Sequence, residues 1–260
     1  MLRWCAYCQG FQGEVAPLDA LTTTHGVCAA CLSKGMRQLN REIPHAHRLR
    51  AIQGRLYEAG KTADNDAASS IVHFAIGAGL RPIDILVGLI TPLLYRIGNE
   101  WEAGQITIAD QQRFSGFCEF VYKLIQLEVR PVEAKKLVSR RFVFLFNVPG
   151  NDHNLGIRIL SLWLESKGIE TREFRQPPTA EELMALIAES KPSAILVSLS
   201  MEGQKAHLYE IARQIEALPS PRPALIVGGY AIKRGLIAPI DGALFIETLN
   251  DLDRLIWSLK

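Results

Sequence analysis

The second half of this 260-residue sequence alternates short apolar runs with longer stretches of helical periodicity. The runs of strand length, of which the second and fifth are weaker, lie at 142–147, 170–174, 194–199, 224–228 and 243–247. Helical patterns lie between and after them, at 154–167, 180–190, 203–217 and 248–258. Strands that alternate with helices pair in parallel and are covered on both faces. Residues 140–260 are therefore predicted to form a flavodoxin-like (Rossmann-like) α/β domain with five parallel strands.

Residues 46–133 have helical patterns only, and we expect an all-α four-helix bundle. The predicted helices cover about 47–59 and 62–78, then run from Pro82 to Gly104 and from Thr107 to about Val129. Pro92 predicts a kink in the third helix. Thr107-x-x-Asp110 has the form of a capping sequence for the fourth. The connections are short, as in antiparallel bundles, and residues 134–141 are expected to be a linker.

Four of the five cysteines form two Cys-x-x-Cys pairs, Cys5/Cys8 and Cys28/Cys31, separated by 19 residues. In a reducing compartment this spacing favours a tetrahedral Zn(II) site, and four thiolates leave no open position for catalysis. Two disulfides or a redox pair are the alternatives. Residues 1–36 are therefore predicted to be a small zinc-binding knuckle with a structural metal.

Composition limits the classes of protein. A net charge of +2 does not by itself imply a nucleic-acid partner. No apolar run approaches the roughly 18 residues of a membrane span, and the first residues do not resemble a signal peptide. Lys and Arg are absent from residues 9–27, so direct DNA binding by the knuckle is not expected. We expect a cytoplasmic protein with no membrane partner.

Small and polar residues follow several predicted strands. His153 follows the first strand, Ser198 and Ser200 follow the third, and Gly228-Gly229 follow the fourth. Ligands of open α/β sheets bind at the carboxyl ends of the strands. Each feature alone has a plain structural reading, since His is common in loops and paired Gly is common in turns. A dinucleotide is not indicated, because the first turn lacks Gly-x-Gly-x-x-Gly.

The order of these residues resembles the cobalamin-binding domain, whose signature is Asp (or Glu)-x-His-x-x-Gly, then Ser-x-Leu, then Gly-Gly. The resemblance implies that His153 is the lower axial cobalt ligand, with Gly156 completing its motif. It implies that Ser200 binds the nucleotide tail of the cofactor and that Gly228-Gly229 let the tail pass. Two positions depart from the signature. Asn151 replaces the carboxylate, with an oxygen that can still accept a hydrogen bond from the imidazole Nδ1–H, and Glu202 replaces the Leu.

The segment from Ile97 to Ala109 resembles the helical cap of cobalamin-dependent light sensors of the CarH type. In that family a Trp-x9-Glu-His motif covers the upper face of adenosylcobalamin. Trp101 matches the Trp, although a core indole at a helix end is the alternative reading. Gln111 and Gln112 occupy the Glu-His positions, and Gln112 cannot replace His as a strong cobalt ligand.

These resemblances imply a light- or cofactor-sensing regulatory protein that holds a tetrapyrrole between bundle and sheet. Adenosylcobalamin is favoured, and biliverdin beside or in place of it is the second option, as in the related photocobilins. We expect signalling through a regulatory protein partner, with a homo-oligomer as a further option, and no enzymatic activity. The alternatives are a corrinoid shuttle protein of a methyltransferase system and a cofactor-free interaction module that kept the fold.

Overall fold

The computed structural model describes residues 1–36, 44–129, 142–151 and 153–258. The chain divides into two compact units, Met1–Arg130 and Pro131–Lys260. The linker predicted at 134–141 lies outside the described residues. None of the helices in the described ranges combines the length and the apolar character that a membrane span requires.

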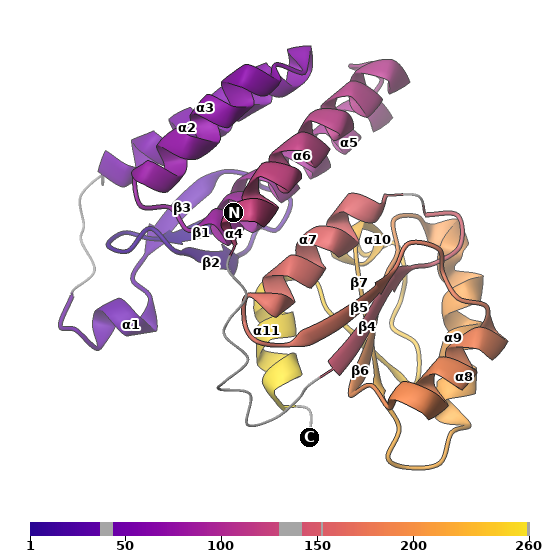
Figure 1. Ribbon diagram of the computed structural model, residues 1–260. Coiled ribbons are helices and arrows are strands. Elements are labelled where there is room, and N and C mark those ends of the chain that lie inside the picture. The colour runs from indigo at the N-terminus through magenta and orange to yellow at the C-terminus, as the bar shows by residue number, and fades with distance from the viewer. Residues whose placement is uncertain (37–43, 130–141, 152, 259–260) are drawn as a thin grey trace. The chain divides into compact units, whose positions relative to one another are not determined.

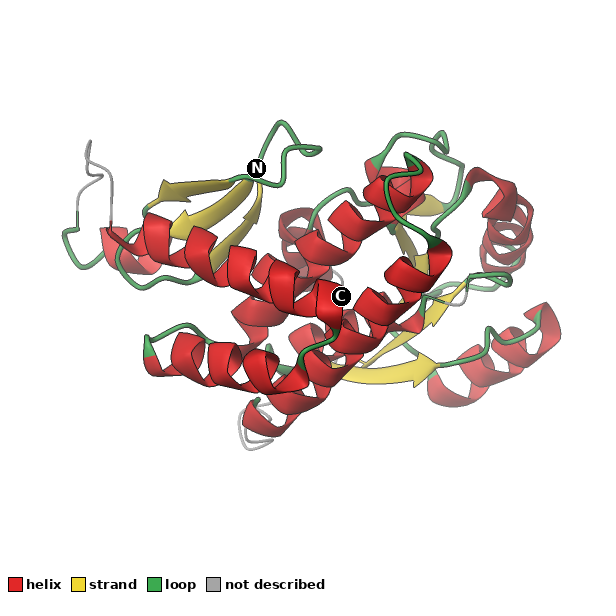
Figure 2. Ribbon diagram, turned by 90° about the horizontal axis from the view of Figure 1, so that it is seen from above, coloured by secondary structure: helices red, strands yellow, loops and turns green. Residues whose placement is uncertain are grey.

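The first unit begins with a three-stranded sheet. Its strands are β1 (Leu2–Cys5), β2 (Phe11–Glu14) and β3 (Thr23–Gly26), in the order β2-β1-β3. β1 pairs antiparallel with β2 and parallel with β3. The short helix α1 (Ala29–Leu32) follows. The predicted knuckle thus contains a small sheet, whose strands lie next to a helix of the same unit (Figure 2).

The rest of this unit is helical, as predicted. Its elements are α2 (Pro44–Thr62), α3 (Asn65–Gly77), α4 (Pro82–Ile85), the π-helical segment η1 (Leu86–Ile90), α5 (Thr91–Glu102) and α6 (Ile108–Glu128). α4, η1 and α5 follow one another without a break and act as one helix. With α2, α3 and α6 they make the four predicted helices of this part of the unit (Figure 1). α2 packs against α3 and α6, and α5 packs against α6. The predicted cap of α6 is confirmed, because the Thr107 hydroxyl accepts from the Asp110 N–H and the Asp110 carboxylate accepts from the Thr107 N–H.

A kink is predicted at Pro92, and the structure has the π-helical turn η1 ending two residues before this proline. Proline has no N–H to donate to the carbonyl four residues earlier, and its ring crowds that carbonyl. The N–H and the hydroxyl of Thr91 both donate to the carbonyl of Leu86, five residues back, with the hydroxyl at 3.1 Å. The wider turn accommodates the proline without ending the helix.

The second unit has the predicted five-stranded parallel sheet. Its strands are β4 (Phe142–Asn147), β5 (Glu170–Phe174), β6 (Ala194–Ser198), β7 (Ala224–Gly228) and β8 (Ala243–Phe245), in the order β5-β4-β6-β7-β8. Each neighbouring pair is parallel. The helical elements are α7 (Asn154–Glu165), α8 (Ala180–Ser190), the 3₁₀ turn η3 (Glu202–Gln204), α9 (Lys205–Glu216), α10 (Tyr230–Lys233) and α11 (Leu249–Ser258).

Helices cover both faces of this sheet. α7 and α11 lie on one face, and α8 and α9 lie on the other (Figure 1). The central strands β4, β6 and β7 are nearly continuous apolar runs because both of their faces are buried. β5 is an edge strand with an exposed, charged sequence, which explains its weaker signal. The four-residue helix α10 was not predicted.

Candidate functional site

The carboxyl ends of three central strands lie at one level of the sheet. Asn147 at the end of β4 pairs in register with Ser198 of β6, and Ser198 pairs with Gly228 of β7. His153 follows β4 as the N-cap residue of α7, and its side chain is exposed. The predicted residues of the second unit are therefore brought together at one edge of the sheet.

Gly156 lies one helical turn after His153, so the two positions share a face of α7. A Cβ placed at Gly156 would meet no heavy atom within 4 Å. The surface over the first turn of α7 is therefore open at Gly156, and a flat ligand could approach the backbone there closely.

A hydrogen-bonded asparagine network holds the turn that carries His153. The side-chain oxygen of Asn151 accepts from the backbone N–H of His153 at 3.2 Å, and its Nδ2 donates to Asn147 Oδ1 at 3.3 Å. Asn147 in turn donates to Asn154 Oδ1 at 3.0 Å. Asn151 is buried. In this structure Asn151 thus orients the backbone at His153, whereas the sequence suggested a bond to the imidazole Nδ1–H.

The paired glycines have a role in packing within the chain. Gly229 has φ +106°, in the region that favours glycine. A Cβ there would overlap the carbonyl oxygen of Leu199 and lie 2.8 Å from Ser198 Oγ. A Cβ at Gly228 would lie 3.2 Å from Ile246 Cγ1. The close approach of the turn after β7 to the end of β6 therefore requires glycine even without a ligand.

The loop after β6 contains a residue that the sequence did not reveal. Gln204 is 5% exposed, and its Oε1 accepts from the N–H groups of Ser200 at 2.9 Å and Met201 at 3.1 Å. Its Nε2 has no hydrogen-bond partner among the described residues. A buried amide donor without an acceptor is costly, but this nitrogen has almost no exposed surface and so is not presented to a ligand at this edge. The only signal in the sequence is an amide four residues after Ser200.

Glu202, which replaces the Leu of Ser-x-Leu, points to the surface. Its carboxylate lies 3.1 Å from Lys205 Nζ, and both side chains are well exposed. The substitution therefore does not bury a charge at this edge of the sheet.

In the first unit, Trp101 lies in the last turn of α5 and is 45% exposed. A core position for this indole is thus excluded. Ile108 at the start of α6 is also exposed. Gln111 donates to Ser115 Oγ at 3.2 Å, and Gln112 is exposed. The end of α5 and the start of α6 thus expose two apolar side chains, with the amides of Gln111 and Gln112 on the same helix α6. None of these four side chains is an imidazole.

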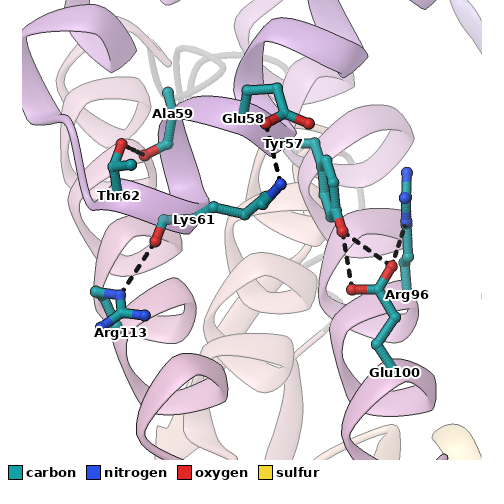
Figure 3. A network of polar contacts seen from close by, with 8 residues as sticks. All are labelled: Tyr57, Glu58, Ala59, Lys61, Thr62, Arg96, Glu100 and Arg113. Atoms are coloured by element: carbon teal, nitrogen blue, oxygen red, sulfur yellow. Dashed lines mark hydrogen bonds and ion pairs between the residues drawn. The ribbon is translucent and has the colours of Figure 1, made fainter. Parts of the chain in front are cut away.

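A polar network next to Trp101 joins three helices (Figure 3). Tyr57 on α2 donates to both carboxylate oxygens of Glu100 on α5, at 2.9 and 3.0 Å. Arg96 Nε donates to Glu100 at 2.7 Å, and its guanidinium lies 3.7 Å from the centre of the Tyr57 ring. Arg113 Nε on α6 donates to the carbonyl of Lys61 on α2 at 3.1 Å. The turn of α5 that carries Trp101 is thereby fixed to the bundle.

The four paired cysteines converge at one point of the first unit. Their sulfur atoms all lie within 4.8 Å of one another. The Sγ atoms of Cys8 and Cys28 are 3.7 Å apart, near the edge of about 3.8 Å for a tetrahedron with Zn–S bonds of about 2.3 Å. The cysteines are free, so the structure contains neither of the two disulfides considered above. Their number and geometry fit a closed tetrahedral metal site.

The electrostatics of this cluster favour a cation. Burial and the neighbouring thiols raise the pKa of Cys8, and they raise the pKa of Cys31 to about 12. Burial also raises the pKa of Cys5, but hydrogen bonds from the backbone of Cys28, Cys8 and Tyr7 outweigh it and lower the pKa to about 6. Four thiolates repel one another at this distance, and a divalent cation would remove that repulsion.

Comparison with known proteins supports a cobalamin-binding family. Residues 52–121, from α2 to α6, match the family model described as B12 binding domain. The HTH-type transcriptional repressor CarH of Myxococcus xanthus is 24% identical over 214 residues, 82% of this chain and 68% of the relative. The trimethylamine corrinoid protein of Methanosarcina barkeri is 20% identical over 197 residues, 75% of this chain and 89% of the relative.

One solved structure has the same fold. The monomethylamine corrinoid protein of Methanosarcina barkeri aligns with a TM-score of 0.66 at 16% identity, over 79% of this chain and 97% of that chain. The helical segment and the five-stranded parallel sheet of this chain match the B12-binding fold. This match confirms the predicted architecture. The expectation that DNA is not a partner gains no support, because one relative is a transcriptional repressor.

Proposed function

We propose that this chain binds cobalamin at the carboxyl edge of its parallel sheet and acts as a light- or cofactor-sensing regulatory protein. The observation that carries the proposal is the exposed imidazole of His153, held at the end of β4 in a turn that Asn151 fixes. Loops at this edge are the usual ligand sites of such sheets. The family match in the helical unit supports the same cofactor.

The residues at this edge fit a corrinoid. Gly156 leaves open space over the first turn of α7, the helix that begins directly after His153. When bound, cobalamin would supply a cobalt ion that can take an imidazole nitrogen as a ligand. His153 would provide the protein ligand on the lower side. Ser198 and Ser200 lie half-buried at the same edge, and they would hydrogen-bond the nucleotide tail.

The upper side is proposed to lack a strong protein ligand. An amide such as Gln112 is a poor ligand for cobalt, since imidazole and thiolate bind it better. The exposed Trp101 is instead suited to apolar contact with a large upper substituent. This favours adenosylcobalamin over a form with histidines on both faces. A bilin such as biliverdin remains our second candidate ligand, since it needs apolar and amide contacts but no axial ligand.

A corrinoid shuttle is the second candidate function. The similarity to two methylamine corrinoid proteins favours it. The exposed Trp101 and the additional cysteine cluster favour the sensor. Transfer of a methyl group from the methylated protein to a thiol acceptor, in the presence of a partner methyltransferase, would establish the shuttle and overturn the sensor.

The primary test is retention of pigment. Purified protein is incubated with adenosylcobalamin or with biliverdin, passed through gel filtration, and illuminated while visible spectra are recorded. The sensor proposal expects coloured protein whose spectrum changes with light. If both pigments elute free, the chain is a cofactor-free module and the proposal is overturned.

We further propose that Cys5, Cys8, Cys28 and Cys31 hold Zn(II) in a structural role, because their sulfur atoms converge as a tetrahedral site requires. We also propose that the protein passes its signal to a regulatory protein partner. DNA is the competing partner. A pull-down with labelled DNA and a pull-down with immobilised protein, each in light and in darkness, would separate the two.

A further inference from the structure

The turn after the first cysteine pair is docked onto the junction between α3 and α4. Gln9 Nε2 donates to the carbonyl of Ala78 at 3.2 Å, and the Phe11 N–H donates to Asp84 Oδ2 at 3.1 Å. Gln9 directly follows Cys8, and Phe11 lies three residues after that cysteine. Any movement of this turn on metal loss would therefore act on residues 78–84.

Arg81 and Asp84 form an ion pair beside the cysteine cluster, and Asp84 belongs to α4. Asp84 is 3% exposed, and its carboxylate accepts from Arg81 Nε at 2.6 Å and from Nη2 at 2.9 Å. A Cβ at Gly10 would lie 3.3 Å from Arg81 Nη2 and 3.5 Å from Cys8 Sγ, so the guanidinium lies beside the cluster. Four thiolates and one divalent cation would together carry a net negative charge, and the guanidinium would compensate part of it.

Two aromatic rings of the small sheet rest on η1. A Cβ at Gly88 would overlap the Trp4 ring and lie 2.9 Å from Phe11 Cδ2. Trp4 directly precedes Cys5 and is completely buried, and its ring centre lies 5.2 Å from that of Phe11. The sheet that carries Cys5 is therefore packed onto the one π-helical turn of the described residues.

We infer that metal occupancy of the four-cysteine site is thermodynamically linked to η1, and through it to α5, the helix that carries Trp101. The three strands of the sheet have four residues each, too few to hold a fold alone, so the metal and the contact with η1 would each stabilise the other. Metal loss then releases Trp4 and Phe11 from Gly88. By reciprocity, a change at Gly88 weakens metal binding. The inference rests on the proposed zinc site and is independent of cobalamin.

The test compares Gly88→Ala with Gly54→Ala. Gly54 lies on α2, where a Cβ would meet nothing within 4 Å, so it controls for the helical effect of the substitution. Zinc affinity is measured by competition with a chromogenic chelator. We expect Gly88→Ala to weaken zinc binding by about 5- to 150-fold, the usual range of coupling between sites, and Gly54→Ala to leave it unchanged. Equal zinc affinity in both variants would overturn the linkage.

A second measurement uses the wild-type chain, in case Gly88→Ala does not fold. Hydrogen exchange is compared with bound zinc and after removal of zinc by chelator. We expect faster exchange in residues 82–102 and unchanged exchange in β4, β6 and β7. Unchanged exchange in 82–102 refutes the linkage while leaving the zinc site intact. Protein that neither contains zinc nor takes it up refutes the proposed zinc site itself.

Discussion

The side-chain oxygen of Asn151 accepts a hydrogen bond from the backbone N–H of His153 at 3.2 Å, and its amide nitrogen donates to Asn147 Oδ1. Asn151→Asp would restore the carboxylate of the cobalamin-binding signature, but it would lose the donor and place a charge in a buried position. We expect a loss of about 1–3 kcal/mol in the free energy of unfolding, the cost of an unsatisfied buried group. Urea unfolding of the purified variant measures it.

Asn154→Asp is the matched control for that prediction. Asn154 uses its oxygen to accept from Asn147 Nδ2, and an aspartate keeps that acceptor. A negative charge in the first turn of α7 is also favourable. We expect unchanged or slightly higher stability. Equal losses in both variants would show that the donor of Asn151 is unimportant.

His153→Ala should separate cofactor binding from folding. The imidazole is exposed, and the N-cap of α7 has no hydrogen bond from this side chain, so stability should change by no more than about 0.5 kcal/mol. In protein loaded with cobalamin, the visible spectrum should shift to that of cobalt without a protein imidazole. An unchanged cobalamin spectrum would show that His153 is not the ligand.

The α/β architecture could be predicted from the sequence because its signals are local. Each buried strand is an apolar run, and each following helix has its own periodicity and cap, such as Thr179 with Glu182. The small amino-terminal sheet could not be predicted in this way. Its four-residue strands depend on contacts between residues far apart in sequence, such as Trp4 with Gly88.

The edge of the sheet at which the candidate residues lie was predictable from the sequence, and their contacts were predictable only in part. The order of His153, Ser200 and Gly229 located the edge of the sheet, because the carboxyl ends of parallel strands meet there. The partners of the polar groups were not predictable. Gln204 is a surface-type residue that is buried here, and the oxygen of Asn151 binds the backbone of His153. Such choices depend on tertiary packing.

Tyr57→Phe tests the network beside Trp101. Removal of the hydroxyl leaves Glu100 with Arg96, and we expect a loss of about 1 kcal/mol at neutral pH. A double-mutant cycle with Glu100→Gln would give the coupling between Tyr57 and Glu100. A coupling energy of zero would show that the bonds at 2.9 and 3.0 Å do not stabilise the unit.

The same pair predicts a pH dependence. Burial and then the hydrogen bond to Glu100 raise the pKa of Tyr57 above its ordinary value of 10.0. Since the folded-state pKa is raised, the stabilisation is fully present below about pH 10 and is lost as the pH rises through the folded-state pKa. The stability difference between wild type and Tyr57→Phe should therefore be constant from pH 7 to 9 and shrink above pH 10. A difference that grows above pH 10 would reverse the sign and exclude this cause.

Gly229→Ala separates the packing role of the glycine pair from a role in ligand binding. The backbone of Gly229, with φ +106° and ψ −180°, lies in a region that is essentially restricted to glycine and costs an alanine about 1–3 kcal/mol, and overlap with the carbonyl of Leu199 adds about 1–3 kcal/mol. Gly235→Ala is the control, because Gly235 also has positive φ but a Cβ there meets nothing within 4 Å. We expect Gly235→Ala to lose only the cost of the left-handed conformation, about 1–2 kcal/mol. If unfolding measurements give equal losses for the two variants, the contact with β6 is unimportant. Weaker cobalamin binding by Gly229→Ala without additional instability would then indicate direct contact with the ligand.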